Sequence, residues 1–329
     1  MTVLAPGKVT VDVRLVPEDL RRALRHDARA GLCAQPKTMP PVWFYDDRGC
    51  ELYEAITRTP EYYPFRAERD LLRRSAGEIA EASGASVLVE LGSGTSEKTR
   101  LLLEAMAGGT AGLAGYVPFD VAEGTLRTAA QSVADDFDIG VHGVVGDFHE
   151  HLDDIPDLDG PRLVAFLGST IGNFPPPQRA RFLGEVAALL NPSDRFLLAT
   201  DLVKPVDRLV VAYDDAEGVT AAFNLNLLSV LNRELGADFD PGRFVHRAVW
   251  DPDNRWMEMR LEAQEAMVVH VPELDVEVEF AAGEQMRTEI SAKFTFDQVR
   301  RELGAVGLQV TGLWTDAAGD YLMTLARPA

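Results

Sequence analysis

The sequence predicts an α/β fold built on a mostly parallel sheet, with a smaller α+β region inserted into it. Between residues 86 and 200, short apolar runs alternate with helical patterns, as they do where helices join parallel strands. Near the C-terminus two strand-like runs, 308–314 and 320–326, follow each other closely. Such a tight connection joins antiparallel neighbours, so we expect a reversed hairpin at the end of the sheet.

The parallel strands are predicted from runs that are apolar throughout, the pattern of a strand buried on both faces. These runs are 86–91, 115–120, 140–145, 162–167 and 195–200. The segments 96–107, 122–135 and 177–190 between them are predicted to be helices.

After Asp201 the pattern changes for about ninety residues. A helix-rich segment at 214–235 precedes two runs, 256–263 and 273–280, in which polar and apolar residues alternate. This alternation indicates an antiparallel sheet, hence a separate subdomain, before a helix at 296–305 leads back to the terminal hairpin. We expect one domain of residues 64–202 and 293–329, and a second domain of residues 12–63 and 203–292.

Composition and charge exclude several classes of protein. The 32 Lys and Arg residues stand against 52 Asp and Glu residues, a formal charge of −20, and so acidic a surface repels nucleic acid and anionic lipid. The N-terminus has no signal-peptide pattern, no apolar run is long enough to span a bilayer, and the two cysteines build no disulfide framework. We therefore expect a soluble, cytoplasmic protein. His149 and His151 form the closest histidine pair but lack further ligands, so no metal is expected.

The strongest local motif is the segment VLVELGSGTSEKT at 87–99, in which a buried strand ends in the turn Gly92-Ser93-Gly94. Glycines there let backbone amides approach a ligand at the carboxyl edge of the sheet. A dinucleotide fingerprint requires a third glycine where this chain has Glu97. The motif thus favours a ligand that lacks a pyrophosphate.

Acidic side chains follow the next two strands. Asp120 ends its strand in a position that commonly binds ribose hydroxyls, and Asp147 with Phe148 follows the third strand and suits a purine. Either aspartate taken alone also fits a helix cap, but together with the glycine turn the two occupy successive strand ends in order.

These features resemble the class I S-adenosylmethionine-dependent methyltransferases, whose Rossmann-like sheet ends in the same reversed hairpin. Longer strings, among them FLGSTIGNF, AYDDAEGVTAAFN and FAAGEQMRTEIS, are similar to the histidine Nα-methyltransferase family of ergothioneine biosynthesis, of the actinobacterial type. The resemblance implies transfer of three methyl groups from S-adenosylmethionine to the α-amino nitrogen of L-histidine, which gives hercynine. It also implies that the first domain binds the cofactor and the second, inserted domain binds the substrate.

The resemblance further implies roles for particular residues. The substrate site would comprise Tyr62, Gly168, Asn173, Tyr213, Met259, Glu289 and Ser291. The cofactor site would comprise Tyr45, Gly92, Lys98, Asp120, Asp147 and Phe148. Tyr45 and Asn173 would be catalytic, no metal would take part, and the substrate would be a small molecule. Separately, no long exposed apolar seam suggests an obligate dimer, so we expect a monomer.

Simpler roles and other functions remain open for these residues. Tyr62 fits a packed corner, Asn173 a turn, Met259 a core position, and Glu289 with Ser291 a solvated strand face. A different aromatic amino acid such as tryptophan is one alternative substrate. A non-catalytic sensor of the cofactor or of histidine is another alternative.

Overall fold

The computed structural model describes residues 5–148, 150–156 and 158–329, and the chain forms two compact units. We call the first the sheet unit; it comprises Pro64–Val203, Phe294–Ala329 and the described residues before Val16. We call the second the inserted unit; it comprises Val16–Tyr63 and Lys204–Lys293. Nowhere in the described part of the chain does a helix have the length and apolar character required to cross a membrane.

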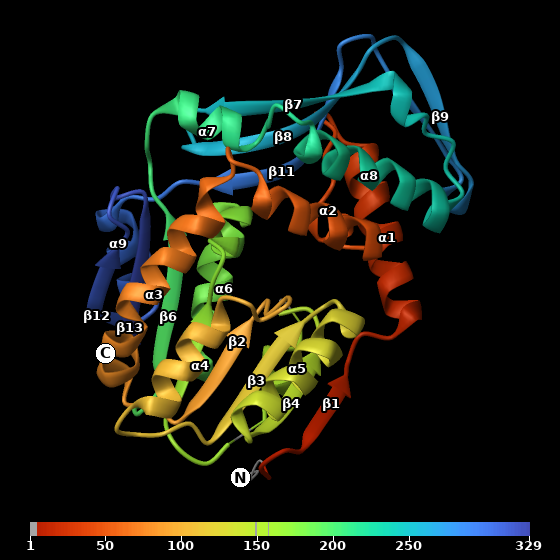
Figure 1. Ribbon diagram of the computed structural model, residues 1–329. Coiled ribbons are helices and arrows are strands. Elements are labelled where there is room, and N and C mark those ends of the chain that lie inside the picture. The colour runs from red at the N-terminus through yellow and green to blue at the C-terminus, as the bar shows by residue number, and fades with distance from the viewer. Residues whose placement is uncertain (1–4, 149, 157) are drawn as a thin grey trace. The chain divides into compact units, whose positions relative to one another are not determined.

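The sheet unit is built on one sheet of eight described strands in the order β1-β4-β3-β2-β5-β6-β13-β12 (Figure 1). Their bounds are β1 Val9–Val13, β2 Val87–Leu91, β3 Gly115–Asp120, β4 Gly140–Val145, β5 Arg162–Phe166, β6 Arg195–Asp201, β12 Leu308–Thr315 and β13 Tyr321–Pro328. Strands β1 to β6 pair in parallel, whereas β13 runs antiparallel to both β6 and β12. The expected α/β fold with a reversed terminal hairpin is confirmed.

Two features of this unit differ from the expectation. The strand β1 was not predicted, and the expected second domain began at residue 12, yet Asp12 and Val13 pair with Val144 and Val145 of β4. The run VTVDV is too short and too polar to be recognised as a strand from the sequence. It becomes an edge strand through its pairing with β4. The helix expected from residue 96 begins at Thr99. Ser96 cannot belong to it, because its φ of 56° lies outside the right-handed helical region.

Helices cover both faces of this sheet. The core on one face joins apolar side chains of α3 (Tyr63–Ser83), α4 (Thr99–Gly108) and α5 (Glu123–Phe137) to side chains of the central strands. On the other face lies α6 (Pro176–Leu189), where the ring centre of Phe182 is 4.7 Å from that of Phe166 in β5. Helix α9 (Phe296–Ala305) contacts α6. Strand β2 lies between β3 and β5, so the chain order reverses there. In open α/β sheets, ligands commonly bind at the carboxyl ends of the strands at such a point.

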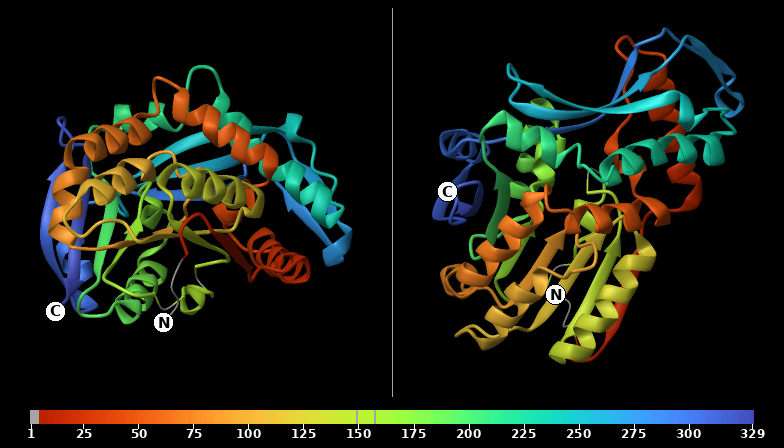
Figure 2. Two further views of the ribbon diagram at one scale, coloured as in Figure 1. Left: turned by 60° about the horizontal axis from the view of Figure 1, so that its bottom comes forward. Right: turned by 45° about the horizontal axis from the view of Figure 1, so that its top comes forward.

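The inserted unit joins helices to antiparallel strands. Its helices are α1 (Pro17–Leu32), α2 (Asp47–Arg58), α7 (Val206–Ala212) and α8 (Val219–Leu235). A three-stranded sheet has the order β11-β8-β7, with β11 Gln285–Ala292, β8 Trp256–Ala263 and β7 Phe244–Asp251, and β9 Met267–Val271 pairs with β10 Val276–Phe280. Figure 2 shows α8 lying along the three-stranded sheet, where Asn224 of α8 contacts His246 of β7 and the carbonyl oxygen of Arg260 of β8.

The antiparallel character predicted for this unit is confirmed, with one boundary corrected. The run expected as a strand from residue 273 becomes a strand only at Val276, because Pro272–Leu274 form a 3-10 turn and Asp275 has a φ of 52°. Further 3-10 turns lie at Pro41–Phe44, Leu152–Asp154, Thr170–Asn173 and Pro241–Arg243.

Candidate functional site

The glycine turn after β2 has the open geometry of a ligand cradle. Gly92 and Gly94 have φ angles of 73° and 49°, in the left-handed region that side chains rarely adopt. A Cβ atom added to either residue would meet no atom within 4 Å, so the space beside the turn is open. The glycines are therefore needed for the backbone conformation, and the space beside them is available to a ligand.

Asp120 lies directly beside this turn. Its Oδ2 atom accepts a hydrogen bond of 2.7 Å from the Gly94 amide, and its Oδ1 atom accepts one of 2.9 Å from the Ala122 amide. Burial raises the pKa of Asp120, while these amide donors act in the opposite direction. Asp120 thus couples the glycine turn to the end of β3, and it is not the cap of α5, which begins after Ala122.

A buried carboxyl beneath the turn fastens α4 to the sheet. Glu90 is 2% exposed and accepts hydrogen bonds of 2.5 Å from both Thr99 Oγ1 and the Tyr116 hydroxyl. The Tyr116 hydroxyl also lies 2.9 Å from Ser96 Oγ. Burial raises the pKa of Glu90 to about 7, although both hydroxyl donors lower it.

Glu68 is a buried carboxylate that sequence reasoning missed. It forms an ion pair with Lys98, and its Oε1 atom accepts hydrogen bonds from the Gly168 amide at 2.7 Å and from the Tyr321 hydroxyl at 3.0 Å. It therefore links Lys98, expected at the cofactor, with Gly168, expected at the substrate. Nothing local distinguishes it from the exposed acids of α3, since an acid on an amphipathic helix usually faces solvent.

Phe148 and Asn173 also follow strands of this sheet. Phe148 is half-buried and lies in an aromatic cluster. The centre of its ring is 5.6 Å from that of Phe166, 5.9 Å from that of Phe174 and 5.7 Å from that of Phe182. Asn173 ends the 3-10 turn after β5. Both residues thus follow strands at the carboxyl edge of the sheet, where open α/β folds commonly bind ligands.

The sheet unit has an unsatisfied group where a ligand is expected. The Oγ atom of Ser93, within the glycine turn, is buried and has no hydrogen-bond partner among the described residues. A buried polar atom without a partner destabilises a fold, so it indicates a polar ligand atom in the functional state. Together with the open space at Gly92 and Gly94, Ser93 fits a ligand that is held by close backbone contact.

In the inserted unit, an irregularity in β11 decides which way the expected substrate residues point. Arg287 lies opposite Arg260 of β8, but Glu289 lies opposite Met259, because the register shifts by one residue between Arg287 and Glu289. Such a bulge moves the following side chains to the other face of the sheet. Glu289 and Ser291 consequently share the face of Met257 and Met259.

Thr288 is the extra residue of this bulge, and buried contacts anchor it. Its hydroxyl lies 2.7 Å from Asn224 Oδ1 of α8 and 3.0 Å from the carbonyl oxygen of Met259. Asn224 Nδ2 also lies 2.8 Å from His246 Nδ1, and His246 Nε2 lies 2.7 Å from the carbonyl oxygen of Tyr213. Burial lowers the pKa of His246, which favours the neutral ring that accepts from Asn224 and donates to Tyr213.

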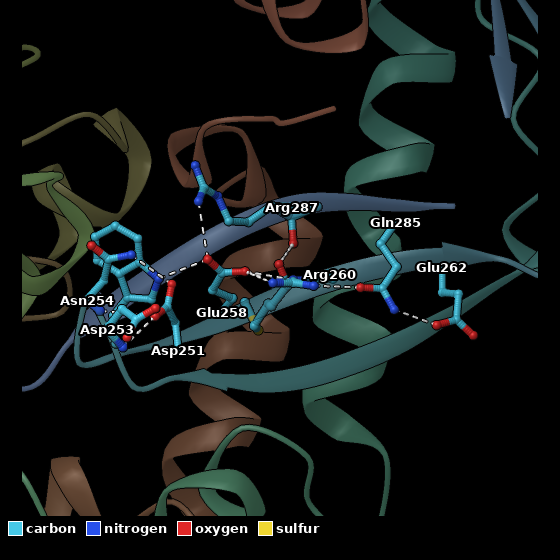
Figure 3. A network of polar contacts seen from close by, with 11 residues as sticks. Asp251, Asp253, Asn254, Glu258, Arg260, Glu262, Gln285 and Arg287 are labelled. Atoms are coloured by element: carbon cyan, nitrogen blue, oxygen red, sulfur yellow. Dashed lines mark hydrogen bonds and ion pairs between the residues drawn. The ribbon is translucent and has the colours of Figure 1, made fainter. Parts of the chain in front are cut away.

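The opposite face of the same sheet carries an ionic network, drawn in Figure 3. The buried carboxylate of Glu258 accepts from Arg260 Nε at 2.7 Å, from Arg287 Nη1 at 3.2 Å and from Trp256 Nε1 at 2.9 Å. Arg260 donates in turn to Gln285, at 2.7 Å. The charges of Arg260 and Arg287 are thus paired with Glu258 on the face opposite to the one that carries Glu289 and Ser291.

Three of the expected tyrosines lie together in the inserted unit. Tyr53 lies between two of them, with its ring centre 5.9 Å from that of Tyr45 and 6.4 Å from that of Tyr62. The ring centres of Tyr62 and Tyr213 are 6.4 Å apart. Burial, followed by the nearby Tyr53, Tyr213 and Glu289, raises the pKa of Tyr62 well above its ordinary value. The Tyr62 hydroxyl therefore keeps its proton and serves as a hydrogen-bond donor rather than as a base.

Tyr213 and Ser291 meet directly, and a buried lysine joins them. The Tyr213 hydroxyl donates to Ser291 Oγ at 2.7 Å, while Lys293 Nζ donates to the Tyr213 hydroxyl at 2.8 Å and to Ser291 Oγ at 2.9 Å. Sequence reasoning missed Lys293. The signal available for it was its spacing, two residues after Ser291 at the end of a strand.

The expected site residues are divided between the two units. The sheet unit contains Gly92, Lys98, Asp120, Asp147, Phe148, Gly168 and Asn173, and the inserted unit contains Tyr45, Tyr62, Tyr213, Met259, Glu289 and Ser291. Within the described ranges there is no cluster of three or more His, Cys, Asp or Glu side chains that could hold a metal ion, and His149 lies outside those ranges.

The sheet order, the reversed hairpin and the glycine turn with Asp120 are those of an S-adenosylmethionine-dependent methyltransferase. Residues 24–328 match the family described as "Histidine-specific methyltransferase, SAM-dependent", and the chain belongs to this family. The resemblance read from the sequence is confirmed.

Two similar proteins match this chain over nearly its whole length. It is 54% identical to the histidine N-alpha-methyltransferase of Mycolicibacterium smegmatis over 95% of this chain and 97% of that protein. It is 50% identical to the histidine N-alpha-methyltransferase of Mycobacterium tuberculosis over 92% of this chain and 94% of that protein. A 4-dimethylallyltryptophan N-methyltransferase of Claviceps purpurea is 31% identical over 63% of each chain.

Proposed function

We propose that this chain transfers three methyl groups from S-adenosylmethionine to the α-amino nitrogen of L-histidine and so forms hercynine, a step of ergothioneine biosynthesis. The observation that carries the proposal is the bulge in β11, which places Glu289 and Ser291 on one face beside Met259. A carboxylate that accepts and a hydroxyl two residues away suit the two nitrogens of an imidazole. The 54% and 50% identical relatives named histidine N-alpha-methyltransferase support the same substrate.

The sheet unit would hold the cofactor, which supplies an activated methyl group on a sulfonium. Gly92 and Gly94 let the backbone approach it, and Ser93 offers the buried hydroxyl that lacks a partner among the described residues. Asp120 would bind the ribose, and Asp147 with Phe148 would bind the adenine. Lys98 would contribute through its ion pair with Glu68.

Substrate recognition would use the remaining expected residues. Asn173 and Tyr213 would bind the carboxylate of histidine, and Gly168 with Asn173 would lie near its amine. Tyr45 and Asn173 would align the reacting groups, because transfer from an activated donor depends mainly on orientation and exclusion of water. Tyr62 would orient the amine, since its hydroxyl keeps its proton.

Methylation of another aromatic amino acid is the second candidate. It is supported by the Claviceps relative, which is named a 4-dimethylallyltryptophan N-methyltransferase. That match is weaker and covers less of this chain than the two histidine N-alpha-methyltransferases do. An indole also has one nitrogen, so it would leave either Glu289 or Ser291 without a ring partner. A sensor without turnover would bind the cofactor but form no product.

The setting of the enzyme is also a proposal. We propose that it acts as a cytoplasmic monomer on a free amino acid, without nucleic acid or membrane partners. The formal charge of −20 supports the absence of nucleic acid and membrane partners, because it opposes binding to phosphate backbones and anionic lipids.

Mass spectrometry tests the function directly. The purified protein is incubated with S-adenosylmethionine and each free amino acid in turn, and trimethylated histidine is the expected product. We expect Glu289→Gln to lose most of this activity, whereas Glu279→Gln, which removes an exposed charge from β10 of the same unit, retains it. Methylation of tryptophan instead of histidine would select the second candidate. Cofactor binding without product from any amino acid would indicate a sensor.

A further inference from the structure

The buried carboxylate of Glu68 holds two segments that follow different strands of the sheet unit. Its Oε2 atom accepts from Lys98 Nζ, and its Oε1 atom accepts from the Gly168 amide at 2.7 Å and from the Tyr321 hydroxyl at 3.0 Å. Glu68 has no exposed surface, whereas the side chain of Lys98 is 15% exposed. The two oxygens of one side chain thus fix different parts of the carboxyl edge of the sheet.

The segment held by Oε1 is a strained turn. Gly168 and Ser169 have φ angles of 74° and 56°, and a serine persists in the left-handed region only where its surroundings hold it there. Glu68 accepts from the Gly168 amide, and Ser169 Oγ accepts from the Asp201 amide at 2.9 Å. The 3-10 turn Thr170–Asn173 follows directly. Glu68 therefore helps to set where this turn and its last residue lie.

The segment held by Oε2 is the start of α4. Lys98 directly precedes this helix and comes four residues after Gly94 of the glycine turn. Its Nζ atom also lies 5.0 Å from the centre of the Phe65 ring, three residues before Glu68 on α3. A lysine ammonium is carried on a flexible four-carbon chain, so the ion pair with Glu68 limits the positions that it can take.

We propose that Glu68 is a positioning residue for both reactants, holding Lys98 for the cofactor through one oxygen and the Gly168 turn for the substrate amine through the other. This inference rests on the proposed function, which places Lys98 at the cofactor and Gly168 with Asn173 near the amine. Methyl transfer depends on the alignment of the two reactants, so one carboxylate that fixes both segments contributes to it. Glu68 acts through these segments and is not itself a catalytic residue.

Two conservative variants separate the two contacts. Lys98 Nζ and the Gly168 amide only donate, so the NH2 group of Glu68→Gln faces a donor whichever way it turns. The backbone amide is fixed and the lysine chain is flexible, so glutamine should keep its oxygen on Gly168 and release Lys98. Glu68→Asp has the opposite effect. Its charge is retained and Lys98 can follow it, but the shorter side chain no longer reaches the Gly168 amide.

The sheet unit contains a matched control at the other end of β5. Asp194 is also a buried carboxylate that accepts from a basic side chain and from a backbone amide, here Arg162 Nη2 at 2.6 Å and the Asn191 amide at 2.8 Å. Arg162 begins β5, whereas Gly168 follows its end. Asp194→Asn therefore weakens an equivalent buried ion pair without touching the segments that Glu68 holds.

The test measures steady-state methylation in the wild type and the three variants, with S-adenosylmethionine and L-histidine varied in turn. We expect Glu68→Gln to raise KM for S-adenosylmethionine about tenfold and to change KM for histidine less than about twofold, because a charged contact is lost only at Lys98. Glu68→Asp should raise KM for histidine about tenfold, lower kcat, and change KM for S-adenosylmethionine less than about twofold. Asp194→Asn should leave both KM values within about twofold of the wild type.

A double-mutant cycle traces the effect on the cofactor to the ion pair. In a Lys98→Met background, Glu68→Gln should change KM for S-adenosylmethionine by less than about twofold, because the group that Glu68 holds is absent. An equal effect in both backgrounds would overturn the inference. So would equal changes of both KM values in Glu68→Gln and Glu68→Asp, or changes of the same size in Asp194→Asn, since each indicates general damage to the fold.

Failure of the proposed function has a different signature. A wild type that forms no methylated histidine would overturn that function and the part of the inference that concerns the amine. Calorimetric binding of S-adenosylhomocysteine, the product of the methyl donor, then decides the part that concerns Lys98. Binding to Glu68→Gln about tenfold weaker than to the wild type would support it, and unchanged binding would overturn it.

Discussion

The buried carboxyl of Glu90 makes the stability of the sheet unit depend on pH. Its pKa is raised from the ordinary value of 4.5 to about 7, chiefly by burial, although Thr99 and Tyr116 donate hydrogen bonds to it. Between these two values the folded state keeps a proton that the unfolded chain has lost. The folded state is therefore favoured at low pH, and stability falls as pH rises from 4.5 towards 7.

The size of the effect follows from the two pKa values. The full difference corresponds to about 3 kcal/mol, and the part that falls between about pH 5.5 and pH 8 is about 2 kcal/mol. Glu90→Gln keeps the size of the side chain and removes the titration. Its amide can accept from Thr99 and donate to Tyr116, because the Tyr116 hydroxyl can in turn donate to Ser96.

The measurement is urea unfolding followed by circular dichroism at constant ionic strength, at several pH values. Between about pH 5.5 and pH 8, we expect the free energy of unfolding of the wild type to fall by about 2 kcal/mol relative to that of Glu90→Gln, which lacks this titration. Glu97→Gln removes an exposed charge from the same turn and should follow the wild type. If the wild type and Glu90→Gln curves run parallel over this range, the pKa of Glu90 is not raised and the reasoning fails.

Two further predictions concern the anchor of the β11 bulge. Thr288→Val removes the hydroxyl that lies against Asn224 and the carbonyl oxygen of Met259, so unfolding free energy should fall by about 1–3 kcal/mol and KM for histidine should rise; unchanged thermal unfolding and KM would contradict this. The lowered pKa of His246 means that its contribution to stability is complete above the ordinary value of 6.5 and is lost as pH falls below it. His246→Gln should therefore show a weaker loss of stability between about pH 7 and pH 5 in thermal unfolding, and equal losses in both proteins would argue against a neutral His246.

The fold was predictable where local pattern and burial coincide. Strands β2 to β6 lie within a residue or two of the predicted runs, because a strand buried on both faces is apolar along its whole length. The strand β1 was missed, and so were β7, β9 and β11, because their runs are half-polar or exposed at the edge of a sheet. Such segments become strands only through the partner that they pair with.

The sequence alone determined the class of the fold, the glycine turn after a buried strand, Asp120 at the end of the next strand, and the membership of the family. These features depend on neighbouring residues or on the order of strands, both of which are written along the chain. Only the tertiary structure decided that Glu289 and Ser291 share a face with Met259, because a bulge of one residue shifts the register with β8. It alone also revealed Glu68 as a buried carboxylate paired with Lys98, and Lys293 as a buried ammonium that donates to Tyr213 and Ser291. A charged residue has the same letter whether it faces water or the core, and only long-range packing determines which.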